Sequence, residues 1–308
     1  MGVKVFAPAS VANLAVGYDT LGLCLEGPGD EVVADWRDEP GVVISEITGA
    51  KGKLPLEVQR NTAGRAALAV YESHGDRSRG IRLQVRKKMP FGSGLGSSSA
   101  SAVAGAMAAN ELLRRPFSKR ELLRFAAIGE QVADDAWHLD NVAPSLLGGI
   151  CLVRDAETCD VQRLIMPNGL RVVVAHPQVE ILTKNARAVL SPTVPLGDMV
   201  RQQANLGGLI IGLYRNDLQL VQRSLRDIVI EPQRARLIPG FAQVQSGALE
   251  AGALGCSISG AGPSVFALCQ NLTIAKAAGH AMKTAFSQAG LKSTVYDSAI
   301  HPEGAYVC

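Results

Sequence analysis

A glycine- and serine-rich segment joins an alternating strand to a small-residue helix, and it constrains the fold more than any other feature. Residues 81–86 alternate apolar and polar side chains, residues 89–100 read MPFGSGLGSSSA, and an alanine-rich stretch follows as far as Leu113. Backbone N–H groups in such a loop can approach an anion closely, and the amides and dipole of the following helix favour negative charge. The segment predicts a phosphate-binding loop at the start of a helix.

This loop departs from the two best-known phosphate-binding patterns. A Walker A motif requires a lysine after its glycines, and this loop has none there. Gly94 and Gly96 are followed by Ser97, Ser98 and Ser99, which does not fit the dinucleotide fingerprint. Taken alone, the stretch could still be an ordinary turn into a helix, so the chemistry has to be assigned from the rest of the chain.

The charge balance argues against a nucleic-acid partner. The 308 residues include 31 Lys+Arg and 28 Asp+Glu, a formal net charge of +3, and the only tight basic cluster is residues 86–88. Nucleic-acid binders concentrate a larger basic excess in a patch. At 47% hydrophobic and 19% charged residues, the chain has the composition of a globular protein, and its length indicates two domains.

The sequence also argues against a membrane partner and a secretory leader. Glycines and serines crowd the longest nearly uncharged stretch, residues 89–110, and residues 1–8 contain a lysine and a proline where a signal peptide needs an apolar run. The six cysteines form no CxxC pair, which fits neither a zinc site nor a disulfide framework. We therefore expect a cytoplasmic protein with reduced thiols.

Strands and helices alternate along the chain without a long βαβ series, which favours an α+β fold. Periodicity predicts helices over residues 62–74 and 118–132, and Ser118 with Glu121 forms a capping box at the start of the second. A change of pattern places a domain boundary near residue 160, giving domains 1–160 and 161–308. Further helices are expected over 196–214, 218–226, 241–251 and 274–289, and strands over 3–6, 31–36, 81–86, 150–153, 170–175, 264–269 and 293–296.

The loop resembles the central motif of the GHMP kinases, a superfamily of small-molecule kinases whose core reads P-x-x-x-G-L-G-S-S. Pro90 and residues 94–98 match it. Residues 7–22 resemble the N-terminal motif of the homoserine kinase branch, and residues 255–266 resemble the third superfamily motif. Residues 138–149, 183–190 and 231–241 also resemble homoserine kinase segments. The resemblance spans the chain.

The resemblance implies a two-domain α+β architecture, with a nucleotide-binding N-terminal domain of ribosomal-protein-like fold and a ferredoxin-like C-terminal α/β sandwich. It implies transfer of the γ-phosphoryl group of ATP to the side-chain hydroxyl of L-homoserine, giving O-phospho-L-homoserine for threonine biosynthesis. Mg²⁺ would lie between Ser98 and Glu130, and Asn61 and Thr62 are candidates for the nucleotide base. The loop residues expected to bind ATP are Pro90, Phe91, Gly92, Ser93, Gly94, Leu95, Gly96, Ser97, Ser98, Ser99 and Ala100.

Homoserine carries a carboxylate, an ammonium group and a short alcohol arm, and each needs a partner. By resemblance, Arg187 and Arg234 would bind the carboxylate, since a guanidinium fits a planar anion in a bidentate manner. Asp19 would bind the ammonium group. The remaining substrate-side candidates are Asn13, Asn141, Thr183 and Gly260.

Two neighbouring residues, Asp140 and Asn141, are candidates for the group that acts on the substrate hydroxyl. Homoserine kinases are thought to lack a dedicated base, so Asn141 is predicted to orient the hydroxyl, with Asp140 as the alternative, a general base. Ser10 stands where mevalonate kinases show a motif lysine, which argues against mevalonate as the substrate.

Three other functions are consistent with parts of the sequence. The chain could phosphorylate another alcohol or acid, could act as a catalytically silent nucleotide or amino-acid sensor, or could be a nucleic-acid-binding module. The charge balance disfavours the module, and the intact magnesium pair disfavours the sensor. The sequence is also consistent with a homodimer.

Overall fold

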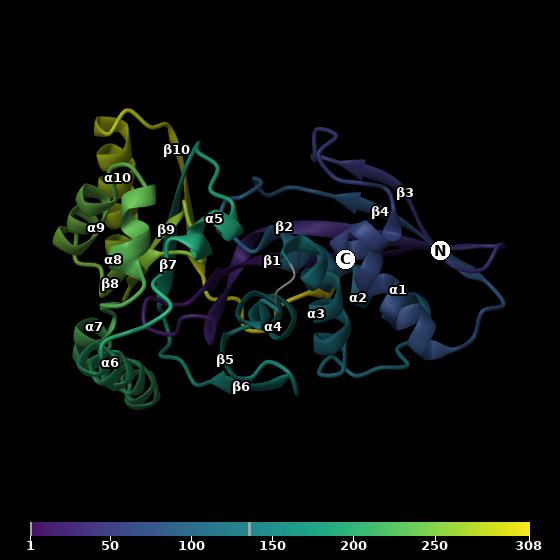
Figure 1. The fold of residues 1–308 in the computed structure, drawn as a ribbon, viewed down its shortest axis with the longest axis horizontal. Helices are drawn as coiled ribbons and strands as arrows, with labels where there is room; N and C mark the ends of the chain where they lie inside the picture. Colours follow the sequence, from purple (N-terminus) through teal and green to yellow (C-terminus); the bar gives the residue numbers. More distant parts are fainter. Residues whose placement is uncertain (1, 135–136) are drawn as a thin grey trace.

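The structure is a computed structural model that describes residues 2–134 and 137–308. It contains a seven-stranded and a four-stranded sheet, each with helices against it, arranged side by side along the long axis of the molecule (Figure 1). The α+β fold predicted from the sequence is confirmed.

The larger sheet is antiparallel except where β3 pairs in parallel with β4. Its order is β11-β1-β2-β4-β3, and β5 pairs with both β2 and β6. β2 is long enough to pair with β4 through one half and with β5 through the other. The strands are β1 (Val3–Ala12), β2 (Leu21–Arg37), β3 (Val42–Thr48), β4 (Gly80–Arg86), β5 (Ile150–Asp155), β6 (Asp160–Leu164) and β11 (Tyr306–Val307).

Four helices pack around this sheet, with α2 at their centre against β1 and β2. Its small side chains allow close approach: a Cβ at Gly105 would lie 2.3 Å from the carbonyl oxygen of Ala63 in α1. Almost all of α2 is buried, so its alanines and glycine build a dense core rather than an amphipathic surface. The elements are α1 (Thr62–His74), preceded by the 3-10 turn Val58–Arg60, α2 (Ser97–Leu112), α3 (Leu122–Asp134) and α4 (Leu139–Leu147).

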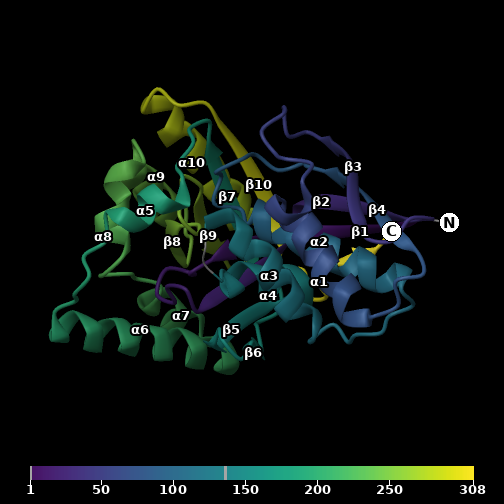
Figure 2. The ribbon, with the colours of Figure 1, turned by 45° about the vertical axis from the view of Figure 1, so that its right-hand side comes forward.

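The smaller sheet is fully antiparallel, in the order β10-β7-β9-β8, with α9 and α10 packed on it. Figure 2 shows α6 as a long helix along one edge of the molecule, near β5 and β6. The strands are β7 (Arg171–Pro177), β8 (Gly255–Ile258), β9 (Val265–Cys269) and β10 (Ser293–Ala299). The helices are α5 (Thr183–Ala188), α6 (Leu196–Arg215), α7 (Leu218–Ser224), α8 (Glu231–Arg234), α9 (Phe241–Glu250) and α10 (Leu272–Gln288), with the 3-10 turn Ala235–Leu237 after α8.

Most predicted elements are present, with different ends. The predicted helix over residues 62–74 has those bounds, whereas the one predicted to begin at Ser118 begins at Leu122. Ser118 and Glu121 still form the expected reciprocal hydrogen bonds, Ser118 N to Glu121 Oε2 at 2.8 Å and Glu121 N to Ser118 Oγ at 3.4 Å. The capping contacts therefore close a turn that precedes the helix.

The predicted division at residue 160 stays a prediction. β6 continues the larger sheet to Leu164, and β11 returns to that sheet by pairing with β1. A division by sheets would fall between Leu164 and Arg171. Among the described residues, no helix combines the length and apolar character needed to cross a membrane.

Candidate active site

A cavity of about 390 Å³ brings the glycine-rich loop and the predicted substrate residues together. Its walls come from both halves of the chain, since α2 and α3 contribute on one side and α5 and α8 on the other. The nucleotide candidates and the substrate candidates therefore share one space. The predicted residues that line it are Asn13, Asp19, Asn61, Thr62, Phe91, Gly92, Ser93, Gly94, Gly96, Ser97, Ser98, Ser99, Glu130, Asp140, Asn141, Thr183, Arg187, Arg234 and Gly260.

The glycines of the loop are required by its backbone and its neighbours. Gly94 and Gly96 have φ values of 74° and 67°, in the left-handed region. A Cβ at Gly96 would lie 2.2 Å from Ser10 Oγ, and one at Gly94 would lie 2.4 Å from the carbonyl oxygen of Ser259. Gly96 is the N-cap of α2, so the first amides of that helix begin at this point beside the cavity.

The two other glycine-containing motifs hold this loop in place. Ser259 Oγ donates to the carbonyl oxygen of Gly94 at 2.6 Å, and Ser264 N donates to that of Ser93 at 3.2 Å. From the N-terminal motif, Ser10 N donates to the carbonyl oxygen of Leu95 at 3.1 Å. The third motif thus supports the loop rather than forming a separate site.

Three of the predicted loop residues have a supporting position. Leu95 and Ala100 are fully buried in the core, and Pro90 is half-buried at the start of the loop. In contrast, Ser93 Oγ and Ser99 Oγ are buried hydroxyl groups that have no hydrogen-bond partner among the described residues. Both residues line the cavity, and hydroxyl donors at this place suit phosphate oxygens.

Ser98 and Glu130 converge as the resemblance implied. Ser98 Oγ, in the first turn of α2, donates to Oε1 of Glu130 on α3 at 2.7 Å, and Glu130 is only 2% exposed. Two hard oxygen donors are the right chemistry for Mg²⁺, which usually keeps several waters and binds phosphates as well. Among the residues that the structure describes, no cluster of three or more His, Cys, Asp or Glu side chains could hold a metal ion. A metal at Ser98 and Glu130 would therefore need water or phosphate oxygens as further ligands.

Asn61 caps α1, which gives it a structural role at the edge of the cavity. Its Oδ1 accepts from Gly64 N at 3.2 Å, and its Nδ2 donates to the carbonyl oxygen of Pro55 at 3.1 Å. Both ends of the amide therefore have protein partners. Thr62 is the first residue of α1 and also lines the cavity.

The predicted substrate residues in the cavity include two arginines and one carboxylate. Arg187, in the last turn of α5, pairs with Asp19, whereas Arg234 is 4% exposed and donates to the carbonyl oxygens of Ala186 and Gly260 at 3.0 and 3.2 Å. Burial lowers the pKa of the Arg234 guanidinium, a desolvation cost that a bound carboxylate would offset. Thr183 begins α5 beside this pair.

Tyr18 connects the two arginines, and the sequence reasoning missed it. The guanidinium carbons of Arg187 and Arg234 lie 5.7 and 5.1 Å from the centre of its ring, within range of cation–π attraction. Its position inside the N-terminal motif, next to Asp19, was the available signal.

Asn13 shapes the turn that carries these residues. Its φ of 72° is left-handed, which Asn tolerates, and its Oδ1 accepts from Asp19 N at 3.0 Å. Its Nδ2 donates to the carbonyl oxygen of Gly260 at 3.0 Å. Asn13 therefore ties the N-terminal motif to the third motif and positions Asp19.

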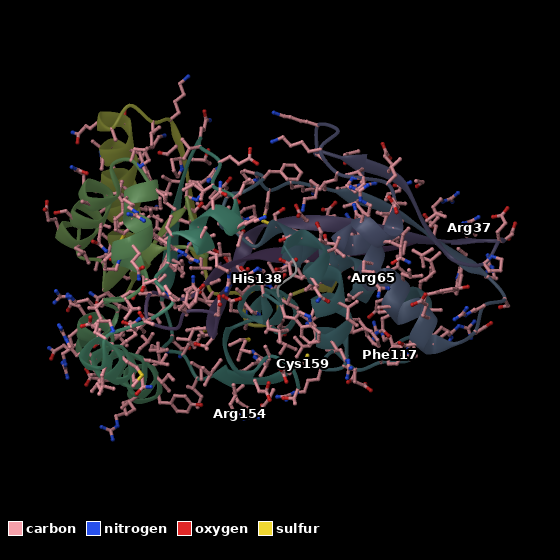
Figure 3. The ribbon with its side chains drawn as sticks, in the orientation of Figure 1. Arg37, Arg65, Phe117, His138, Arg154 and Cys159 are labelled. Atoms are coloured by element: carbon pink, nitrogen blue, oxygen red, sulfur yellow. The ribbon has the colours of Figure 1, made fainter. Side chains whose placement is uncertain are left out.

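Asn141 and Asp140 occupy the start of α4, with different surroundings. Ser10 Oγ donates to Asn141 Oδ1 at 2.8 Å, which fixes the amide so that its nitrogen is the group able to donate to a substrate hydroxyl. Burial raises the pKa of Asp140 from its ordinary 3.8 to about 6, with a smaller contribution from Asp19. His138, near the middle of the molecule (Figure 3), opposes this rise.

Comparison with known proteins agrees with this geometry. Residues 61–149 match the GHMP kinases N terminal domain, and residues 209–288 match the GHMP kinases C terminal family. The chain is 46% identical to a homoserine kinase of Chlorobium phaeovibrioides, with 99% of each chain covered, and 43% identical to one of Xylella fastidiosa, with 98% of this chain and 92% of that one covered.

Solved structures show the same relationship. The crystal structure of homoserine kinase from Cytophaga hutchinsonii superimposes with a TM-score of 0.97 at 46% identity, covering 100% of this chain and 97% of that one. A mevalonate kinase from L. major shares the fold alone, with a TM-score of 0.72 at 16% identity, covering 96% of each chain. Together with the two family matches, these relatives show that the chain belongs to the homoserine kinases of the GHMP kinase superfamily.

Proposed function

We propose that this protein transfers the γ-phosphoryl group of ATP to the side-chain hydroxyl of L-homoserine, releasing ADP and O-phospho-L-homoserine for threonine biosynthesis. The observation that carries the proposal is the shared cavity, in which the glycine-rich loop faces a carboxylate and two arginines. A phosphate-binding loop alone would fit any nucleotide protein. Paired charges of both signs across the same space fit an amino acid as the acceptor.

The loop and α2 would bind the triphosphate through backbone amides and the serine hydroxyl groups. Arg234 and Arg187 would bind the substrate carboxylate, and Asp19 would bind its ammonium group. The transition state of phosphoryl transfer is loose, so the enzyme mainly has to position the reactants and stabilise charge. Asn141, held by Ser10, would orient the acceptor hydroxyl, which needs no strong base.

We further propose that Ser98 and Glu130 hold Mg²⁺. The metal would neutralise charge that develops on the phosphate oxygens. These two residues contribute oxygen ligands and fix the metal's place at the start of α2. We also expect a cytoplasmic enzyme, and the homodimer stays a prediction.

The test is an ADP-release assay with homoserine, mevalonate, shikimate, galactose and serine as acceptors. We expect homoserine to be preferred, and Arg234→Ala to raise the KM for homoserine by about 100-fold, because a charged hydrogen-bonded pair contributes about 3 kcal/mol. Arg236→Ala is the matched control, since Arg236 is exposed on the next turn. Preference for an acceptor without an amino group would refute the substrate assignment, and no ADP with any acceptor would favour a sensor.

A further inference from the structure

Asp30, on β2, is a buried carboxylate that the sequence analysis did not single out. It has 0% exposure, and five donors surround it. Its Oδ1 accepts from the backbone N–H groups of Lys88 and Met89, at 2.8 and 3.2 Å. These two residues lead directly into the glycine-rich loop.

The other oxygen of the same carboxylate binds the far end of the loop. Asp30 Oδ2 accepts from Ser97 Oγ at 2.8 Å and from Ser101 Oγ at 3.1 Å, in the first two turns of α2. It also pairs with Lys87 Nζ. The Asp30 side chain therefore holds both ends of the glycine-rich loop: the residues that follow β4 and the first turns of α2.

Lys87 completes this cluster and has no donor to spare for a phosphate. Its ammonium group has three N–H donors. They are directed at Asp30 Oδ2, at the carbonyl oxygen of Ser97 (2.8 Å) and at Ser101 Oγ (2.7 Å). Although Lys87 lines the cavity, its hydrogen bonds hold the loop, unlike those of a Walker A lysine.

We propose that Asp30 is a positioning residue for the nucleotide phosphates: by holding both ends of the loop, it fixes the direction of the amides at the start of α2. This inference rests on the proposed function, because it takes the loop to be the ATP site. The positioning role also predicts a change in ATP affinity opposite to the one expected from charge alone. Removing a carboxylate near a triphosphate should tighten ATP binding by Coulomb attraction, whereas loss of positioning should weaken it.

The test is Asp30→Asn in the full-length protein, with steady-state kinetics for both substrates and with thermal shifts by ATP and Mg²⁺. We expect the KM for ATP to rise by about tenfold or more, since hydrogen bonds to a charged group are stronger than those between neutral groups. The KM for homoserine should change less than about twofold, because Asp30 touches none of the residues at the substrate end. The stabilisation by nucleotide should shrink accordingly.

Two further variants make the result decisive. Ser101→Ala removes one partner of Asp30 and should raise the KM for ATP by about threefold to tenfold, which keeps the test available if Asp30→Asn does not fold. Glu31→Gln is the matched control: the neighbouring residue on β2 pairs with Lys88 and Arg86, and its variant should leave both KM values unchanged.

The failures of the two proposals differ. Folded Asp30→Asn protein with an unchanged or lower KM for ATP would overturn the positioning role, as would equal rises of KM for both substrates. Wild-type protein that binds ATP but phosphorylates no homoserine would instead overturn the proposed function. In that case ATP binding by the wild type and the variants could still be compared from their thermal shifts.

Discussion

Arg187 Nη2 lies 3.2 and 3.1 Å from the two carboxylate oxygens of Asp19, joining α5 to the turn of the N-terminal motif. Both side chains are partly exposed at the cavity, at 44% and 40%. An exposed pair of this kind contributes little to stability. It does place opposite charges next to each other. In the proposed function, the substrate's ammonium group would pair with Asp19 and its carboxylate with Arg187.

We expect Asp19→Asn to raise the KM for homoserine by about tenfold or more, because the ammonium group loses its charged partner. The sharper measurement is the ratio of kcat/KM for homoserine to that for 4-hydroxybutanoate, which lacks the amino group. The variant should lose most of this preference.

Asp198→Asn, at the start of α6, is the control for charge removal and should keep both the KM and the preference. A full preference for homoserine in Asp19→Asn would mean that another group binds the ammonium.

Gly96→Ala should nearly abolish activity. The residue has a φ of 67°, and the new Cβ would meet Ser10 Oγ at 2.2 Å and Asn141 Oδ1 at 2.7 Å. Both the phosphate loop and the hydroxyl-orienting amide would have to move, and we expect kcat/KM to fall by about 100-fold or more.

Gly207→Ala in α6 is its control, because nothing lies within 4 Å of the added Cβ. Alanine is favoured over glycine within helices by about 1 kcal/mol, so this variant should keep its activity and melt slightly higher. Activity near the wild-type level in Gly96→Ala would contradict the close packing around the loop.

If Ser98 binds the metal as proposed, Ser98→Ala should raise the Mg²⁺ concentration that gives half-maximal rate by about tenfold, because the metal loses one oxygen ligand and Glu130 loses the hydrogen bond that orients it. The measurement is a Mg²⁺ titration at saturating ATP and homoserine. Glu130→Gln should behave similarly.

Glu121→Gln, in the exposed turn before α3, should leave the Mg²⁺ requirement unchanged. An unaltered titration in both Ser98→Ala and Glu130→Gln would remove these residues from the metal site.

Asp140→Asn distinguishes an oriented hydroxyl from base catalysis. With Asn141 as the orienting group, kcat should fall by only a few-fold. Loss of a general base should cost about 100-fold or more and should remove the decline in rate below the pKa of Asp140, about 6. The pH profiles of kcat for the wild type and the variant decide between these outcomes.

The same variant should change stability in a pH-dependent way. Since burial raises the pKa of Asp140 from 3.8 to about 6, the folded state binds the proton more tightly, and the wild type loses free energy of unfolding as the pH rises through this range. The shift corresponds to at most about 3 kcal/mol. Urea unfolding should show Asp140→Asn to be the more stable protein at pH 7.5, with an advantage that disappears towards pH 4.

Local patterns in the sequence predicted the helices, strands and loops whose periodicity and capping residues all lie within a short stretch of chain. α1 is one example, and the glycine-rich loop with its helix is another. β2 was recognised only over residues 31–36, because Gly27, Pro28 and Gly29 interrupt the pattern of a strand that covers residues 21–37. α4 was missed because it is short and contains Pro144.

The residues of the site divide in the same way. Motifs supplied Ser98, Arg187 and Arg234, and the cavity brings them together. Asp30 could not be found from spacing, because its role depends on contacts across a long stretch of chain, such as the one with Ser101 over 71 positions. Tyr18 lies inside a motif, but its contact with Arg234, 216 positions away, is visible only in the structure.

The pairing of β11 with β1 has a consequence for how this enzyme is made. Val307 lies opposite Val5, and Cys308 N donates to the carbonyl oxygen of Lys4, so one edge of the seven-stranded sheet is contributed from beyond residue 300. A ribosome that has synthesised only the first 160 residues has not yet supplied that edge. Until translation has passed through the residues of the four-stranded sheet, this edge of β1 has no strand beside it, although β2 can already pair with its other edge.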